Sequence, residues 1–95
     1  MERRRFLVTG GSQGIGEAVV ERVRESGHEV VFTGRDASRL ESVSRRTGGH
    51  GLAADVASEE DNARTVEFCL ERMGGIDVLV NNAGYAYRGE IGSID

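Results

Sequence analysis

The sequence predicts an α/β protein in which a parallel sheet is covered by helices on both faces. Two observations support this prediction. Short apolar runs of strand character alternate along the 95 residues with segments whose apolar residues recur at helical spacing. A glycine-rich turn, residues 9–16, stands between the first apolar run and the first helical segment. Because parallel strands are joined by helical crossovers, this alternation predicts a doubly wound parallel sheet.

Seven elements are predicted in chain order. Strands are expected at 5–9, 29–33, 51–54 and 76–80, and helices at 14–26, 37–46 and 59–73. The strands are short and rich in β-branched or aromatic residues, as in the Val-Val-Phe run at 30–32. That composition is typical of strands buried on both faces of a parallel sheet. We find no internal repeat and no linker, so residues 1–95 are expected to form one small domain.

Each helix is predicted from an apolar stripe and from residues that favour its ends. The stripe residues are Ile15, Val19 and Val23 in the first helix, Leu40 and Val43 in the second, and Ala63, Val66, Leu70 and Met73 in the third. Asp36 or Ser38 could cap the second helix, and Ser38 with Glu41 has the spacing of a capping box. Ser58 is expected to cap the third helix. Glycines follow all three helices and favour their termination.

The handedness of crossovers predicts the order of the strands. Right-handed connections place the first three strands outward in one direction, with the first two helices on one face. The fourth strand then returns to the other side of the first, which puts the third helix on the opposite face. The predicted order is 3-2-1-4, the first half of a doubly wound sheet plus one strand. Ligands of this architecture bind where the order reverses, at the carboxyl ends of the first and fourth strands.

Composition argues against several classes of function. The net charge of -4 argues against nucleic-acid binding, which needs a basic surface. No apolar stretch is long enough for a membrane span, and the three apolar residues at 6–8 are too few for a signal peptide. The single cysteine, Cys69, fits a reducing compartment, so a cytoplasmic location is expected. His28 and His50 have no second ligand at metal-binding spacing, so no metal site is predicted.

The glycine-rich turn reads Thr-Gly-Gly-Ser-Gln-Gly-Ile-Gly over residues 9–16. A turn between a strand and a helix directs backbone N–H groups and the positive end of the helix dipole at one spot, which suits a phosphate. Gly10 permits the tight turn, Gly14 lets a pyrophosphate approach the backbone, and Gly16 lets the helix lie against the strand. A merely flexible glycine loop is the alternative, but the flanking strand and helix favour a dinucleotide turn.

The spacing Thr-Gly-x-x-x-Gly-x-Gly resembles the glycine motif of the short-chain dehydrogenase/reductase family in its short, non-extended branch. Two further motifs are similar to that family: Asp-Val at 55–56 after the third strand, and Asn-Asn-Ala-Gly at 81–84 after the fourth. The resemblance implies a Rossmann-type fold. It also implies an NAD(P)-dependent oxidoreductase that transfers hydride between NADP(H) and a carbonyl or alcohol substrate, with no nucleic-acid or membrane partner. The intact protein is expected to be a homo-oligomer.

The resemblance also implies a set of cofactor-binding residues. They are Gly10, Ser12, Gln13, Gly14, Ile15 and Gly16 in the turn, Arg35 after the second strand, Asp55 and Val56 after the third, and Asn82, Ala83 and Gly84 after the fourth. In the family the aspartate accepts a hydrogen bond from the adenine amine, and the backbone of the next residue meets the ring. Taken alone, Asp55 could instead be a helix-entry aspartate, and the Asn-Asn-Ala-Gly motif could be a simple turn.

Arg35 favours NADP over NAD. It stands about 20 residues after the glycine motif, where a ribose-reading residue is expected. A cation there pairs with the 2′-phosphate of NADP, whereas an acid would accept hydrogen bonds from the ribose of NAD. The family's acid usually stands at the position of Gly34. Three alternatives stay open: Asp36 is adjacent and could serve NAD, many NADP-using members carry a basic residue where this chain has Gln13, and Arg35 could be an ordinary solvated arginine.

The sequence offers no catalytic residues. The family's catalytic acid is the tyrosine of Tyr-x-x-x-Lys, whose lysine lowers the phenol pKa. Tyr85 and Tyr87 are followed at that spacing by Gly89 and Ile91, and the chain has no lysine. Family members are longer, at roughly 250 residues. We therefore expect an amino-terminal fragment that carries the cofactor-binding half and is inactive alone, or else a truncated, non-catalytic nucleotide-binding or interaction protein.

Overall fold

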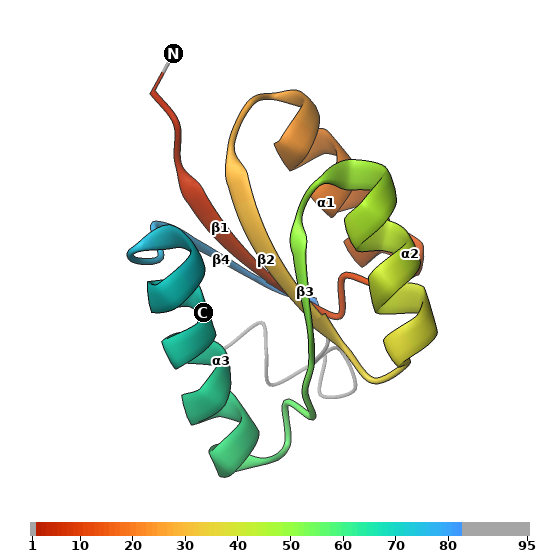
Figure 1. The fold of residues 1–95 in the computed structure, drawn as a ribbon, viewed down its shortest axis with the longest axis vertical. Helices are drawn as coiled ribbons and strands as arrows, with labels where there is room; N and C mark the ends of the chain where they lie inside the picture. The colour runs from red at the N-terminus through yellow and green to blue at the C-terminus, as the bar shows by residue number, and fades with distance from the viewer. Residues whose placement is uncertain (1, 83–95) are drawn as a thin grey trace, which may run out of the picture.

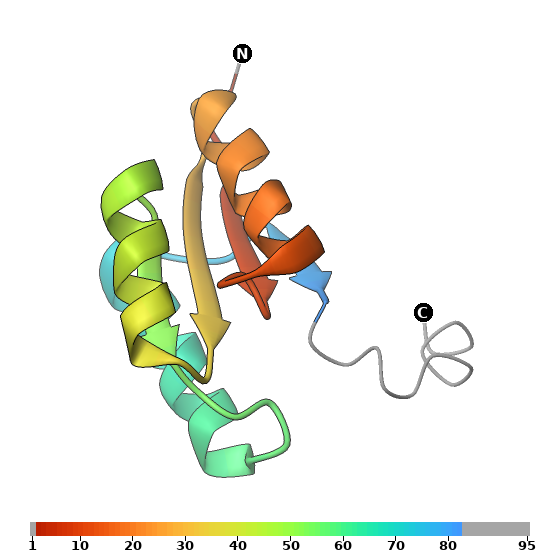
Figure 2. The ribbon, with the colours of Figure 1, turned by 90° about the vertical axis from the view of Figure 1, so that its right-hand side faces the viewer.

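A computed structural model describes residues 2–82 (Figure 1). The strands are β1 Arg5–Thr9, β2 Glu29–Gly34, β3 His50–Ala53 and β4 Val78–Asn81, and the helices are α1 Gly14–Glu25, α2 Ala37–Thr47 and α3 Glu59–Met73. All neighbouring strands are parallel and the sheet order is β3-β2-β1-β4. This confirms the predicted α/β class and strand order. The carboxyl ends of the strands lie at one end of the sheet (Figure 2).

The helices cover the two faces of the sheet as the crossover rule requires. In Figure 1, α1 and α2 lie on one side of the sheet and α3 on the other. Val8 and Phe32 belong to the apolar cluster under α1 and α2, while Leu7 and Val31 pack with Cys69 of α3. Alternate strand residues therefore feed opposite clusters. None of the helices within residues 2–82 combines the length and apolarity needed to cross a bilayer.

The predicted inward stripe of α3 is only partly correct. Met73 is buried as predicted, but Ala63, Val66 and Leu70 are exposed. The helix buries Thr65 and Cys69 in their place. The physical reason is that Thr65 donates its own hydroxyl to the carbonyl of Asp61, at 2.8 Å. A polar residue satisfied in this way can be buried without an outside partner. The spacing of apolar residues alone could not predict that this threonine would be buried.

The predicted stripe of α1 needs a smaller correction. Val23 is buried as expected and Val19 packs against the core, but Ile15 is 75% exposed. Val20 is fully buried and completes the inward face of the helix. Ile15 stands in the first turn, beyond the part of the helix that lies over the sheet. Its side chain is therefore exposed near the carboxyl ends of the strands.

Helix caps resolve one of the open alternatives. The Asp36 carboxylate accepts hydrogen bonds from the backbone N–H groups of Ser38 and Arg39, at 3.0 and 3.3 Å, so Asp36 caps α2. Ser58 caps α3 as predicted, accepting from the N–H of Asp61. No side chain caps α1, whose N-cap residue is Gln13. The amino end of α1 thus keeps its dipole unneutralised by a side-chain acceptor.

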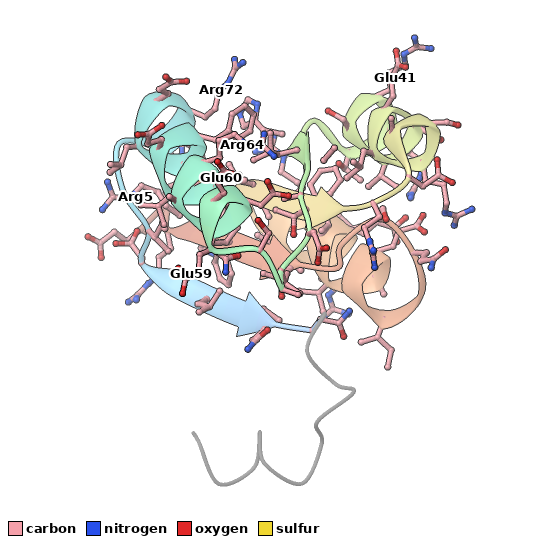
Figure 3. The ribbon with its side chains drawn as sticks, turned by 90° about the horizontal axis from the view of Figure 1, so that it is seen from below. Arg5, Glu41, Glu59, Glu60, Arg64 and Arg72 are labelled. Atoms are coloured by element: carbon pink, nitrogen blue, oxygen red, sulfur yellow. The ribbon has the colours of Figure 1, made fainter. Side chains whose placement is uncertain are left out.

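An ion pair joins the start of β1 to the segment before β4. Asp77 accepts from the backbone N–H, Nε and an Nη of Arg5, each at 2.9 Å. Arg5 is labelled in Figure 3. These hydrogen bonds lower the pKa of Asp77 to about 2. The pair ties the two ends of the described chain together across the β1–β4 edge.

This pair predicts acid sensitivity. An aspartate with a depressed pKa stabilises the fold above its ordinary pKa of about 3.9, and that stabilisation is lost as pH falls toward 2. We expect the free energy of unfolding of Asp77→Asn, measured with urea, to fall less between pH 5 and pH 2 than that of the wild type. Glu41→Gln, which breaks an exposed pair with Arg45 on α2, is the matched control. Parallel pH profiles for wild type and Asp77→Asn would contradict the prediction.

Candidate functional site

A cleft of about 710 Å³ opens at the carboxyl ends of the strands. Its lining includes eight residues of the predicted site: Gly10, Ser12, Gln13, Ile15, Arg35, Asp55, Val56 and Asn82. Four further lining residues are Thr33, Gly34, Asp36 and Ala54. The structure therefore brings together four segments that are far apart in sequence. The predicted Ala83 and Gly84, like Tyr85 and Tyr87, lie outside the described residues.

Gly14 and Gly16 do not line the cleft but shape it. Gly10 and Gly14 have φ angles of 71° and 62°, which side-chain-bearing residues rarely adopt. A Cβ added at Gly14 would meet no atom within 4 Å, so open space lies in front of this backbone. A Cβ at Gly16 would overlap the carbonyl oxygen of Gly10. Gly16 thus allows α1 to lie against the turn, and Gly14 keeps the approach to the turn clear.

The turn is anchored to the end of β2. The N–H of Gly11 donates to the carbonyl of Thr33 at 2.8 Å, and Ser12 is buried. A Cβ added at Gly34 would lie 2.5 Å from Ser12 Oγ and 3.1 Å from Ser12 Cβ. Real Cβ atoms essentially never show the first of these distances, and the second is tighter than most of their contacts. The last position of β2 is therefore too crowded for a side chain while Ser12 keeps its place.

Two charged residues, Arg35 and Asp55, lie close together in the lining of the cleft. The Arg35 side chain is 78% exposed, and one of its Nη atoms lies 3.8 Å from Asp55 Oδ2. At that distance and exposure the pair adds little stability and leaves Arg35 free to contact a ligand. Asp36, next in sequence, has its carboxylate engaged in capping α2. Arg35 is thus the cation of this segment that faces the cleft.

Local hydrogen bonds position Asp55. Its N–H donates to Asp61 of α3 at 2.8 Å, and its Oδ1 accepts from the N–H of Ala57 at 2.9 Å. The bond from Asp55, with the neighbouring Arg64, lowers the pKa of Asp61. Arg64 also reaches back to the carbonyl of Ala53 at the end of β3 (Figure 3). Asp55 therefore lies in the turn that precedes α3 and also lines the cleft, so its two interpretations are compatible.

Asn82 connects β4 to the glycine turn. Its Nδ2 donates to the carbonyl of Gly10 at 3.1 Å, and its N–H donates to Oγ1 of Thr9 at the same distance. The amide therefore donates a hydrogen bond that satisfies a backbone carbonyl of the turn. Because Gly10 sits between β1 and α1, this contact closes the cleft on the β4 side.

Sequence reasoning missed Thr33 and Arg39. The Thr33 hydroxyl is buried beside the cleft and has no hydrogen-bond partner within residues 2–82. Arg39 donates from Nε to the carbonyl of Ser12 at 3.2 Å. The position of Thr33 at the end of a strand was a usable signal, but no sequence signal indicated that Arg39 would reach back to the turn. In the described part of the chain no three His, Cys, Asp or Glu residues gather as a metal-ion site.

The parallel sheet and its crossover helices define a doubly wound α/β protein, in which the glycine turn and the uncapped end of α1 meet at the cleft. The family model for short chain dehydrogenases matches residues 4–95. The chain belongs to the short-chain dehydrogenase family. This confirms the family predicted from the three motifs.

Curated relatives and solved structures agree with this assignment. The chain is 44% identical over 88 residues to a glucose 1-dehydrogenase of Gluconobacter oxydans, covering 86% of this chain and 33% of the relative. It is 40% identical over 83 residues to a serine 3-dehydrogenase of Rhizobium radiobacter, covering 85% and 33%. A 3-ketoacyl-(acyl-carrier-protein) reductase from Brucella melitensis, solved with NADH, superposes with a TM-score of 0.79 at 32% identity, covering 82% and 33%. The chain thus spans about a third of the length of these proteins.

Proposed function

We propose that the cleft binds NADP in preference to NAD and that the whole protein is an oxidoreductase using this cofactor. One observation carries the proposal: β2 ends in a crowded glycine, followed at once by an exposed arginine at the cleft mouth. A Cβ at Gly34 would meet Ser12, so an acid that reads the ribose of NAD could stand there only if Ser12 moved. Arg35 is free to pair with a 2′-phosphate instead.

The occupation of Asp36 supports the same choice. Asp36 is the acid nearest to the end of β2 in sequence, but its carboxylate already accepts two backbone hydrogen bonds at the start of α2. Turning it toward a ribose would uncap the helix, at a cost of about 1 kcal/mol. The acid that could favour NAD is therefore held in a structural role, while the neighbouring cation is not.

The remaining cleft residues fit the other parts of a dinucleotide. The open space before Gly14 and the uncapped amino end of α1 suit the pyrophosphate. Asp55 and Val56 flank the place expected for adenine, and Asn82 with the turn closes the cleft toward the nicotinamide end. When bound, the nicotinamide ring would accept or deliver the hydride. These residues bind and orient the cofactor, and the acid that protonates the substrate is proposed to lie outside the described residues.

The relatives support the class of reaction. The proteins named above are a glucose 1-dehydrogenase, a serine 3-dehydrogenase and a 3-ketoacyl reductase, so all three are oxidoreductases by name. The reductase was solved with NADH, which supports a nicotinamide dinucleotide as the cofactor class. The choice of NADP over NAD rests on Arg35. The chain as given is proposed to carry the cofactor-binding part of such an enzyme and to lack turnover by itself.

The test is the substitution Arg35→Ala. Removing a charge-assisted contact to the 2′-phosphate should cost about 1.5–3 kcal/mol, or roughly 10- to 150-fold in the Kd for NADP. The Kd for NAD should change little because NAD has no phosphate at that position. Calorimetric titration of both cofactors measures the two losses. Arg45→Ala, at the far end of α2 and paired only with Glu41 among the described residues, is the matched control. Equal losses for NADP and NAD would remove Arg35 as the discriminator.

A further inference from the structure

Arg39 places a second guanidinium beside the glycine turn. It lies in the first turn of α2, and its Nε donates to the backbone carbonyl of Ser12 at 3.2 Å. Ser12 is buried, lines the cleft, and stands against the position of Gly34. The contacts therefore run from the end of β2, through Ser12, to Arg39. This guanidinium lies on the α2 side of the same turn that forms the cleft wall.

The partners of Arg39 neutralise only part of its positive charge. Its only ion pair within residues 2–82 joins an Nη to Glu17 Oε1 at the long distance of 3.7 Å. Glu17 pairs more closely with Arg46, which also contacts Glu21. The Arg39 side chain is about half exposed, so its remaining N–H groups are open to a ligand. The weak carboxylate contact distinguishes Arg39 from the tightly paired Arg46.

The charges at the cleft mouth explain why a second cation matters. Arg35 lies 3.8 Å from the carboxylate of Asp55, and Asp36, whose carboxylate caps α2, also lines the cleft. A phosphate monoester adds about -1.5 to -2 near pH 7. One arginine among two carboxylates and a phosphate would leave a strongly negative site, in which like charges repel. Arg39 is not itself a lining residue of the cleft. Its hydrogen bond to Ser12, which does line the cleft, places a second positive charge next to this wall.

We propose that Arg39 is a second specificity-determining residue for the 2′-phosphate of NADP, acting from the α2 side of the turn while Arg35 acts from the end of β2. This inference rests on the proposed preference for NADP. It adds that the preference is shared between two arginines on two elements. The hydrogen bond from Arg39 to Ser12 holds the guanidinium in place, so little side-chain freedom is lost on binding.

The test uses small probes that isolate the 2′-phosphate. Adenosine 2′,5′-bisphosphate and adenosine 5′-monophosphate differ only in that group, so the ratio of their Kd values measures the preference directly. We expect Arg39→Gln to reduce this ratio about five- to tenfold and Arg39→Lys to retain most of it. Arg45→Gln, which breaks only the exposed pair with Glu41 among the described residues, is the matched control and should leave the ratio unchanged. Thermal melts of each variant check the fold.

If Arg39→Gln does not fold, a second variant that should change the ratio of Kd values in the opposite direction still tests the inference. Glu17→Gln removes the carboxylate that competes for Arg39 and should raise the ratio above that of the wild type. Loss of affinity for both probes in equal measure in Arg39→Gln, or an unchanged ratio in either variant, would overturn the inference. A wild-type chain that binds both probes equally would instead overturn the proposed NADP preference itself. The two failures are therefore distinguishable.

Discussion

Replacing Gly16 with alanine is expected to lower the free energy of unfolding by about 3 kcal/mol or more and to abolish nucleotide binding. The added Cβ would overlap the carbonyl oxygen of Gly10 and lie 2.8 Å from its carbonyl carbon and 2.9 Å from Asn82 Nδ2. Relief requires moving α1 away from the turn. That movement would also disturb Val20 and Val23, which α1 buries against the sheet.

Two other glycines provide controls for this experiment. Gly14 and Gly27 have φ angles of 62° and 87°, but an added Cβ meets nothing within 4 Å at either position. Alanine there should cost only the backbone strain, about 1–2 kcal/mol. Gly27→Ala, away from the cleft, should still bind nucleotide, whereas Gly14→Ala should fold and bind poorly because its methyl group occupies the approach to the turn.

Urea unfolding with calorimetric titration of NADP separates the three variants. The ordering expected in stability is wild type, then Gly14→Ala and Gly27→Ala together, then Gly16→Ala. The ordering expected in affinity places Gly27→Ala beside the wild type. If Gly16→Ala proved as stable as Gly27→Ala, the close approach of α1 to the turn would not be a requirement of the fold.

The second large effect expected is self-association of the 95-residue chain. Among residues 2–82, β4 pairs only with β1, so its outer edge carries unpaired backbone groups. Leu79, in the middle of β4, is 59% exposed. It is in register with Leu7, which packs toward α3, so Leu79 faces the α3 side of the sheet.

Helix α3 adds to this apolar surface. Val66 and Leu70 are 46% and 53% exposed. They lie on the flank of α3 opposite Arg64, which reaches β3, so they face the β4 side. Together with Leu79 they leave apolar surface beside an open strand edge. A small domain has little stability to spare for such exposure. We therefore expect the chain to dimerise or aggregate through β4, or to populate a loosely packed state.

Light scattering after size-exclusion chromatography, with near-UV circular dichroism, measures this association. Leu79→Lys should shift the chain toward monomer by placing a charge at the centre of the edge strand. Ser42→Lys, an exposed position of α2 on the other face, controls for the added charge. A monodisperse wild-type monomer with a cooperative melt would refute the prediction.

The sequence by itself determined the architecture of this protein. The alternation of strand and helix patterns, together with right-handed crossovers, predicted the order β3-β2-β1-β4 that the structure has. The glycine spacing and the motifs at 55–56 and 81–84 predicted the family that the comparisons show. These features are local in sequence or follow from the right-handedness of crossover connections, so they can be predicted without knowing which side chains are in contact.

Only the tertiary structure decided how helices and charges face one another. The buried side of α3 depended on Thr65 satisfying its own hydroxyl, which apolar spacing does not reveal. The lack of room at Gly34 depends on Ser12, which lies more than twenty residues earlier in the chain. Arg39 appears equivalent to other arginines in the sequence, yet it reaches back to the glycine turn. Each depends on a partner that is distant in sequence or hidden in backbone geometry, so the packing of the elements had to be known first.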